Sequence, residues 1–213
     1  MSRRTALVAI GRLTADQWGM CTAAQARQAG VSRVDLNRLV NDRILERVAD
    51  AARVYRLAGS PEDPELDGLR AGWLQLGPGR SWDDRVRVAD AIVSHRSAAH
   101  ARGLGELIPT AHEFYVRRRH RVARLDLTLR VRSDVNQIAW SIWRGLPVCS
   151  VEHIVGDLLA DREDESAVAS ICADAIRAGL TDVARLHAAV EPHAARYGST
   201  PDGLVSRLTR VVG

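Results

Sequence analysis

Two arginines and two asparagines recur at helical spacing between residues 33 and 41. They are Arg33, Asn37, Arg38 and Asn41. Arginine can donate two hydrogen bonds to a guanine edge, and asparagine can pair in the same bidentate way with adenine. Both side chains also reach phosphate oxygens. On one face of a helix, these residues would form a surface suited to the edges of base pairs.

The residues before this helix contain the signals of a second short helix and a tight turn. Ala26 is small enough for close helix packing, and Gly30 permits a turn with positive φ. Ser32 and Asp35 have the spacing of a capping box, which predicts that a new helix starts directly after the turn. The predicted core positions are Val31, Leu36 and Leu39. Residues 22–41 therefore predict a helix-turn-helix motif.

A two-stranded wing is predicted to follow, and a further helix is predicted before the motif, at residues 6–18. Residues 44–48 and 53–57 alternate as strands, with a turn at residues 49–52. The wing carries two further arginines. The predicted DNA-binding residues are Ser32, Arg33, Asn37, Arg38, Asn41, Arg53 and Arg56. The alternatives are a winged helix that makes only protein contacts and a small helical domain with a similar pattern.

All thirty basic residues are arginine, and lysine is absent. A Walker A loop, a conventional protein kinase and a Schiff-base enzyme each need a lysine, so these three classes are excluded. The net charge of +4 is unevenly distributed. Residues 1–58 contain ten arginines and five acidic residues, and residues 83–132 contain eleven arginines and six acidic residues. Residues 133–213, by contrast, contain seven arginines and eleven acidic residues. This asymmetry suggests a polyanionic or acidic partner at one end and a different partner at the other.

The length of 213 residues and the 46% hydrophobic content suffice for two small domains. Prolines and acidic residues after residue 59 break the second wing strand, which places a boundary there. We predict a DNA-binding domain at residues 1–58, a linker at 59–65 and a second domain at 66–213. The chain has no run of eighteen apolar residues and no convincing signal peptide, which predicts a soluble cytoplasmic protein without membrane contact.

The second domain is predicted to mix strands and helices. An apolar stripe through Val86, Ala89, Ile92 and Val93 precedes a helix of small residues that ends at Gly103. Alternation over residues 114–131 predicts half-buried antiparallel strands. The helical patterns that follow cover residues 150–159, 168–178, 182–190 and 203–212. The predicted fold class is α+β, with an amino-terminal winged helix-turn-helix followed by a mixed α/β domain.

A run of arginines interrupts the predicted strands of the second domain. It consists of Arg117, Arg118, Arg119 and Arg121, with His120 between the last two. The run is a candidate surface for RNA or for an acidic protein face. A solvated hairpin tip is the other interpretation.

The sequence predicts neither a metal site nor catalytic residues. The seven histidines and three cysteines are scattered, and no HExxH, CxxC or GxSxG pattern is present. Glu152 and Asp157 are five residues apart, so they do not share a helix face well. The cysteines are expected to be buried small hydrophobic residues.

Two segments of the second domain resemble a known family. Residues 92–99, Ile-Val-Ser-His-Arg-Ser-Ala-Ala, followed by Gly-Leu-Gly at 103–105, resemble the start of the second domain of AbiEi-type antitoxins. Residues 145–152, Gly-Leu-Pro-Val-Cys-Ser-Val-Glu, leading to Gly-Asp-Leu-Leu at 156–159, resemble another element of that family. Cys149 stands where threonine is commoner and His153 where arginine is commoner. The resemblance covers roughly residues 10–190.

The resemblance implies an antitoxin that neutralises a partner nucleotidyltransferase toxin and binds the operator DNA of its own operon. A homodimer on that DNA is an open alternative, and no cofactor is implied. Certain mycobacterial antitoxins of this type have been proposed to be atypical serine kinases that phosphorylate the toxin. That alternative would require ATP and Mg²⁺. The phosphates would bind to Arg117–Arg121 or to backbone amides, and the metal to carboxylates such as Asp157 or Asp161. A third hypothesis is a plain winged-helix regulator whose second domain senses a ligand.

Overall fold

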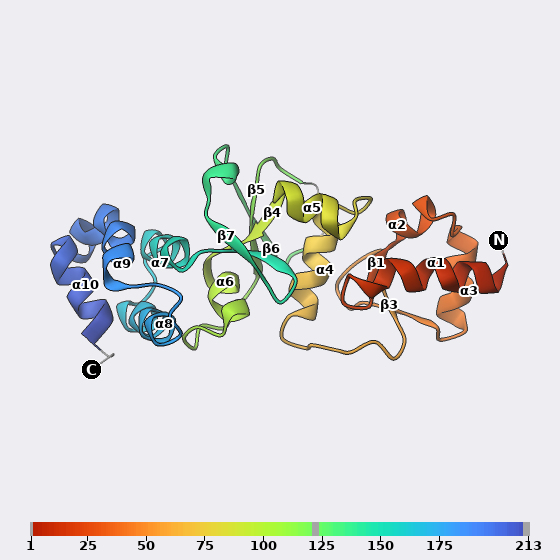
Figure 1. Cartoon of the computed structure of the whole chain (residues 1–213), viewed down its shortest axis with the longest axis horizontal. Helices are drawn as coiled ribbons and strands as arrows, with labels where there is room; N and C mark the ends of the chain where they lie inside the picture. The colour runs from red at the N-terminus through yellow and green to blue at the C-terminus, as the bar shows by residue number, and fades with distance from the viewer. Residues whose placement is uncertain (1, 121–123, 211–213) are drawn as a thin grey trace. The chain divides into compact units, whose positions relative to one another are not determined.

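The computed structural model describes residues 2–120 and 124–210, which form an α+β fold with two sheets (Figure 1). The chain divides into two compact units. The first contains residues 1–91 and 120–127, and the second contains residues 92–119 and 128–213. The division falls inside two strands, β4 (Ala91–Val93) and β6 (Leu127–Val131). The first residue of each strand belongs to the first unit, and its other residues belong to the second.

The first unit starts with three helices and a small antiparallel sheet of order β1-β3-β2. Met20 pairs with Arg56, and Leu45 pairs with Leu57. The elements are α1 (Arg3–Ala15), β1 (Met20–Thr22), α2 (Ala23–Gln28), α3 (Arg33–Asn41), β2 (Leu45–Arg47) and β3 (Val54–Leu57). The helices predicted on both sides of Gly30 and the two predicted strands are therefore confirmed.

The predicted helix at residues 6–18 is displaced. Helix α1 covers Arg3–Ala15, and Ser2 caps it by accepting a hydrogen bond from the amide of Thr5. The chain then turns sharply through Trp18 and Gly19, whose φ angles are +56° and +73°, and enters β1. Strand β1 was not predicted, because three residues are too few to display a period of two.

One apolar core holds the helices of this segment on its sheet. Its members are fully or almost fully buried, and they come from all three helices and all three strands or the turns beside them. They are Ala6, Ile10, Cys21, Ala26, Val31, Leu36, Leu39, Leu45 and Tyr55. The three predicted core positions of the helix pair are all among them. Burial of each large aliphatic side chain stabilises the fold by about 1.5–3 kcal/mol.

The division of the chain differs from the predicted boundary at residues 59–65. Helices α4 (Asp67–Leu76) and α5 (Trp82–Val88) belong to the first unit. The Thr22 hydroxyl donates a hydrogen bond to the carbonyl of Pro78, and the Gln25 side chain donates one to the carbonyl of Arg80 at 2.8 Å. Trp18 also packs edge-on against Trp73, with ring centroids 6.0 Å apart. These contacts bind residues 66–91 to the first unit, and local composition does not reveal them.

The second unit has a five-stranded sheet of order β6-β5-β4-β8-β7 and a group of helices at its carboxyl end (Figure 1). Its further elements are α6 (His95–Arg102), β5 (His112–Val116), the 3-10 helix η1 (Val135–Gln137), β7 (Trp140–Trp143), β8 (Leu146–Cys149), α7 (Val151–Ala160), α8 (Glu165–Arg177), α9 (Val183–Val190), the 3-10 helix η2 (Glu191–Tyr197) and α10 (Pro201–Thr209). The four predicted helices of this region are confirmed as α7 to α10. Residues 211–213, where the last was predicted to end, lie outside the described residues.

The prediction was less accurate for the strands. The structure confirms β5 and β6 within the predicted alternating segment, but residues 121–123 of that segment lie outside the described residues. The apolar stripe through residues 86–93, which was not assigned to a strand, contains β4, in which Ile92 and Val93 are fully buried. Strand β4 pairs in parallel with β8 through Val93 and Val148. Strands buried on both faces have continuous apolar runs and no alternation, which explains why β4 and β8 were missed.

Two expectations from composition can be compared with the structure. Cys21, Cys149 and Cys172 are free and buried, as expected of small hydrophobic residues. Over the part of the chain that the structure describes, no helix has both the length and the apolar content needed to cross a bilayer.

A buried ion pair in the first unit generates a stability prediction. Arg85 is fully buried, its guanidinium lies 3.7 Å from the centroid of the Trp73 ring, and its Nε donates to Asp90 at 3.0 Å. Asp90→Ala should lower the free energy of unfolding by about 3 kcal/mol, because a buried guanidinium would lose its counter-ion. Urea unfolding measures this change.

Arg80→Ala is the matched control, because Arg80 pairs with the same carboxylate at 2.8 Å from a 44% exposed position. Its cost should stay below about 1 kcal/mol, as is usual for exposed ion pairs. Equal costs for the two variants would contradict the importance assigned to the buried pair.

Candidate functional site

Helix α3 is fixed at its start by a turn and a cap. Gly30 adopts φ +84°, and Ser32 follows as the N-cap residue. The amide of Asp35 donates to the Ser32 hydroxyl at 3.1 Å, while the amide of Ser32 donates to the Asp35 carboxylate at 3.3 Å. The Ser32 hydrogen bond is the main reason that the pKa of Asp35 is below its usual value. This reciprocal cap satisfies two amides that a helix start leaves without partners.

The helix buries one side and exposes the other. Leu36 and Leu39 are 3% and 1% exposed, whereas the predicted contact residues of α3 all lie on the surface. The exposed residues of α3 and its cap are Ser32, Arg33, Val34, Asn37, Arg38 and Asn41. Arg38 also lies 3.6 Å from Asp35, with 55% of its side chain exposed. The structure thus places the five predicted residues of α3 and its cap on one accessible face.

The two predicted wing residues differ in position. Arg53 is exposed and has a positive φ of +64°, directly before β3. Arg56 is only 6% exposed, and its guanidinium forms an ion pair with Asp67 at 2.5 Å. The prediction that Arg56 contacts DNA is therefore wrong. Its partner Asp67 begins α4, so the ion pair depends on tertiary packing that the strand pattern does not show.

Sequence analysis missed a third arginine of the wing. Arg47 ends β2, is exposed, and lies opposite Tyr55 of β3 in the antiparallel register. Its guanidinium lies 5.5 Å from the centroid of the Tyr55 ring. This cation–π contact orients the Arg47 guanidinium without neutralising its charge. Sequence analysis could have found this pair, because the arginine and the tyrosine lie on the two strands of the predicted hairpin.

A second candidate site lies in the second unit, where three polar residues from different elements meet. His95 from α6, Tyr115 from β5 and Asp157 from α7 form its centre. The Tyr115 hydroxyl donates a hydrogen bond to Asp157 Oδ1, and the His95 and Tyr115 rings lie 5.4 Å apart. His95 Nδ1 lies 3.5 Å from Asp157 Oδ2, and neither atom has a hydrogen-bond partner among the described residues. The sequence did not predict this cluster.

Charged residues surround this centre in pairs. Arg130 contacts Asp161 at 2.6 Å and Glu113 at 3.3 Å, and Asp161 lies 3.8 Å from His95 Nε2. Arg132 makes two hydrogen bonds to Asp134, at 2.8 and 2.6 Å, and its guanidinium lies 5.2 Å from the centroid of the Tyr115 ring. The outer carboxylates are therefore engaged by arginines.

The environment shifts the protonation of the central groups. Burial raises the pKa of Asp157 to about 7 and lowers the pKa of His95 to about 4. Burial also raises the pKa of Tyr115 above its usual value. Around neutral pH the imidazole is therefore neutral, and Asp157 can either bind or release a proton. His95 also has a positive φ of +51°, a conformation that costs a residue with a side chain roughly 1–2 kcal/mol.

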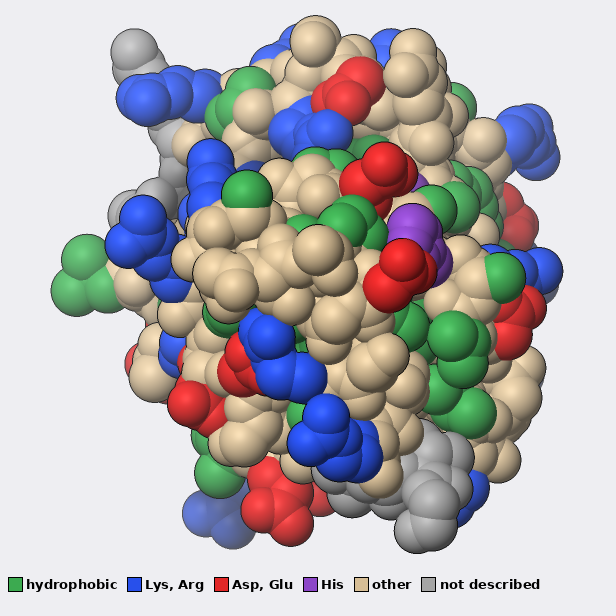
Figure 2. Space-filling view, turned by 90° about the vertical axis from the view of Figure 1, so that its left-hand side faces the viewer, with side chains coloured by type: hydrophobic (Ala, Val, Ile, Leu, Met, Phe, Trp, Pro, Cys, Tyr) green, Lys and Arg blue, Asp and Glu red, His purple; other side chains and the backbone are tan. Residues whose placement is uncertain are grey.

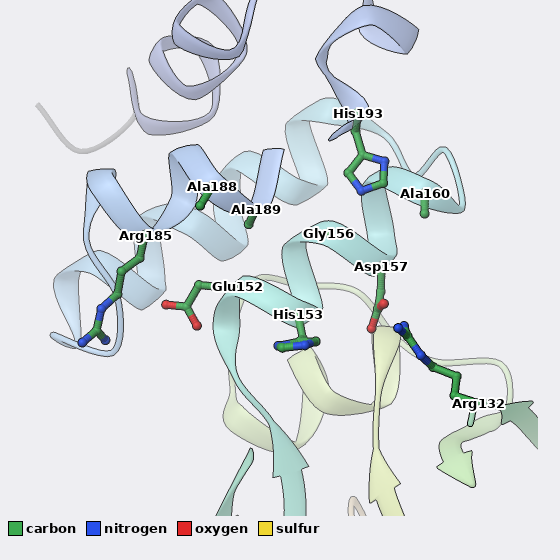
Figure 3. Close-up of a pocket in the computed structure, with 10 residues that line it drawn as sticks. All are labelled: Arg132, Glu152, His153, Gly156, Asp157, Ala160, Arg185, Ala188, Ala189 and His193. Atoms are coloured by element: carbon green, nitrogen blue, oxygen red, sulfur yellow. The ribbon is translucent and has the colours of Figure 1, made fainter. Parts of the chain in front are cut away.

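A pocket of about 550 Å³ opens beside Asp157 (Figure 3). Its small lining residues come from α7 and α9 and are Gly156, Ala160, Ala188 and Ala189. His153 projects from α7 and His193 from η2, while Arg132 reaches toward Asp157 (Figure 3). Burial lowers the pKa of both histidines. The volume is in the range of small-molecule sites, so the pocket is where a ligand-sensing second domain would hold its ligand.

The described arginines of the predicted run are exposed. Arg117, Arg118 and Arg119 directly follow β5 and are all exposed, and the Arg117 guanidinium donates to the side chain of Asn136. Arg121, the fourth member, lies outside the described residues. Arg117, Arg118 and Arg119 are therefore an accessible basic segment, which is compatible with both a binding surface and a solvated hairpin tip.

The residues considered for a metal ion have other contacts. Asp157 accepts from Tyr115, and Asp161 pairs with Arg130. Within the described ranges, no group of three His, Cys, Asp or Glu side chains is arranged to hold a metal ion.

The face at the carboxyl-terminal end mixes acidic, basic and hydrophobic side chains, so no single type dominates its described part (Figure 2).

Comparison with known proteins bears on the fold of the chain. No protein-family model and no curated protein matches the chain. Among solved structures, the fold is similar to the crystal structure of the RV2827C protein from Mycobacterium tuberculosis, with a TM-score of 0.50 and 15% sequence identity. The match covers 98% of this chain and 76% of that chain. At this identity the likeness concerns the fold alone.

Asp157 generates a pH prediction. Its raised pKa means that the folded state binds the proton more tightly, so its contribution to stability is complete below pH 4 and is lost as the pH rises through about 7. Asp157→Asn keeps an oxygen for the Tyr115 hydroxyl but cannot ionise. Wild type loses stability between pH 5 and pH 8, and the variant does not. The free energy of unfolding of Asp157→Asn minus that of wild type should therefore be larger at pH 8 than at pH 5, by roughly 2 kcal/mol.

Urea unfolding at the two pH values measures this difference. Asp83→Asn is the control, because Asp83 is an exposed carboxylate on α5. A pH-independent difference between Asp157→Asn and wild type would contradict the shifted protonation of Asp157.

Proposed function

We propose that this protein binds operator DNA through a winged helix and neutralises a nucleotidyltransferase toxin encoded beside it. The observation that carries the proposal is the exposed face of α3. Arg33, Asn37, Arg38 and Asn41 project from a capped helix whose opposite side is locked into the core. Arginine and asparagine are the side chains that pair with guanine and adenine in the major groove. This function would place the protein in the bacterial cytoplasm.

The order of elements supports the winged-helix interpretation. Helix, strand, helix, helix and two strands follow one another, with the strands arranged β1-β3-β2. In DNA-binding proteins of this kind, the second helix of the pair enters the major groove. Arg47 and Arg53 at the ends of the wing strands would then reach the phosphates of the flanking backbone.

The toxin-directed part of the proposal is supported by the AbiEi-type resemblance and by one structural observation. The two segments that carry the resemblance are far apart in sequence but adjacent in the fold, because β4 pairs with β8 and α6 packs on α7. They jointly supply His95 and Asp157 of the buried cluster. The exposed Arg117–Arg119 run offers an acidic toxin surface a contact that is independent of α3.

DNA binding is tested by substitution on α3 and on the wing. Arg33→Ala and Asn37→Ala should each weaken binding by about 1–3 kcal/mol and relax base preference, because each removes a contact to a base edge. Arg53→Ala should weaken binding to all sequences and reduce the salt dependence, because it removes a phosphate contact. Fluorescence anisotropy on duplexes from the upstream intergenic region measures both effects at two salt concentrations.

Arg87→Ala is the control, because Arg87 is an exposed arginine of α5 in the same unit. It should leave affinity and base preference unchanged. Equal binding of the wild-type protein to operator and unrelated duplexes at moderate salt would refute sequence-specific recognition.

Toxin neutralisation is tested by co-expression with the product of the adjacent gene. Replacing Arg117, Arg118 and Arg119 with glutamate should reduce copurification and rescue of growth by at least about tenfold, because like charges would then face each other. A charge-matched control replaces the exposed Arg177, Arg196 and Arg210. Neutralisation that requires ATP, with transfer of labelled phosphate to the toxin, would instead support the kinase alternative.

A further inference from the structure

The exposed face of α3 contains one hydrophobic side chain among its polar ones. Val34 is 66% exposed, more than Leu7 at 39% or Val8 at 49% in α1. It is absent from the apolar core that holds Leu36 and Leu39. Asn37 and Arg38 follow it by three and four residues, so all three lie on adjacent rows of the same helix face.

Packing in the folded monomer does not require a valine at this position, as at other exposed valines such as Val8 and Val183. A β-branched side chain loses rotamer freedom in a helix, so an exposed valine is a poorer helix residue than alanine. Its small exposed surface also gains nothing from burial in the folded monomer. The polar neighbours Arg33, Asn37 and Arg38 are suited to a nucleic acid, and they leave Val34 as a single apolar point within a polar surface.

The major groove contains one apolar group that the Val34 side chain can contact. Thymine carries a methyl group on its major-groove edge, and adenine presents the N6 donor and N7 acceptor that pair with asparagine. Val34 and Asn37 are about 4.5 Å apart along the helix axis, comparable with the roughly 3.4 Å between successive base pairs. Two neighbouring A·T pairs can therefore face the two side chains together.

We propose that α3 recognises adjacent A·T pairs, with Val34 against the methyl group of a thymine and Asn37 paired with an adenine. This assignment rests on the proposed DNA-binding function and adds its base preference. Arg33 and Arg38 flank the pair of contacts on the same face and supply guanine or phosphate contacts. Binding to the major groove then depends on a methyl group as well as on charge.

The test uses the full-length protein and chemically altered DNA. A preferred site is first selected from a pool of random duplexes, and each thymine is then replaced singly by deoxyuridine, which lacks only the methyl group. One replacement should weaken wild-type binding by about fourfold, the effect expected for burying one methyl group. Val34→Ala should bind the unaltered site about as weakly and should lose sensitivity to that replacement.

Val8→Ala is the matched control, because Val8 is an exposed valine on α1 of the same unit. It should retain the full deoxyuridine effect. Asn37→Ala should lose sensitivity to 7-deazaadenine, which lacks the N7 acceptor, at the base pair next to the critical thymine. Circular dichroism checks that every variant keeps its helices.

The outcomes separate this assignment from DNA binding itself. A selected site in which every deoxyuridine replacement is neutral overturns the role of Val34 while DNA binding stands. A Val34→Ala protein whose binding is weakened by deoxyuridine as much as that of wild type also overturns the role of Val34. Failure to select any preferred sequence overturns both this assignment and the proposed operator binding.

Discussion

The rotation of α3 about its own axis is the constraint on which the candidate DNA surface depends. Leu36 and Leu39 anchor the inner side, and burial of each contributes about 1.5–3 kcal/mol. The Ser32–Asp35 cap adds about 1 kcal/mol and sets the residue at which the helix begins. Since each residue advances a helix by about 100°, a shift of one residue that put Asn37 in the place of Leu36 would turn Asn37 toward the core. The cap and the two leucines together keep the polar row outside.

The sequence was most informative where the structure depends on local periodicity. Gly30, the capping box and the spacing of Leu36 and Leu39 belong to one short segment, so they predicted both the helix pair and its exposed side. Arg56 shows the limit of this approach. Its place in an alternating strand predicted exposure, but Asp67 of a later helix covers it. A strand pattern distinguishes two faces and does not reveal what packs on each.

The polar cluster of the second unit was not predictable for the same reason. His95, Tyr115 and Asp157 come from a helix, a strand and another helix, and only the pairing of β4 with β8 and the packing of α6 on α7 bring these segments together. The resemblance to AbiEi-type antitoxins identified two of the segments but not their contact. As a catalytic residue, Asp157 was judged only against Glu152 of the same helix, whereas burial raises its pKa and Tyr115 of another element donates a hydrogen bond to it.

The two candidate sites hold their polar groups in opposite ways, which bears on what each can do. The α3 face exposes arginine and asparagine to water, so the proposed binding of DNA would exchange water and counter-ions for new hydrogen bonds at small desolvation cost. In the second unit, Asp157 and His95 are already dehydrated, and each keeps one side-chain atom without a hydrogen bond among the described residues. Burial raises the pKa of Asp157 and lowers that of His95, and it resists rearrangement of the two side chains. The first arrangement favours recognition of a large polyanion, whereas the second favours a rigid local structure whose charge changes near neutral pH.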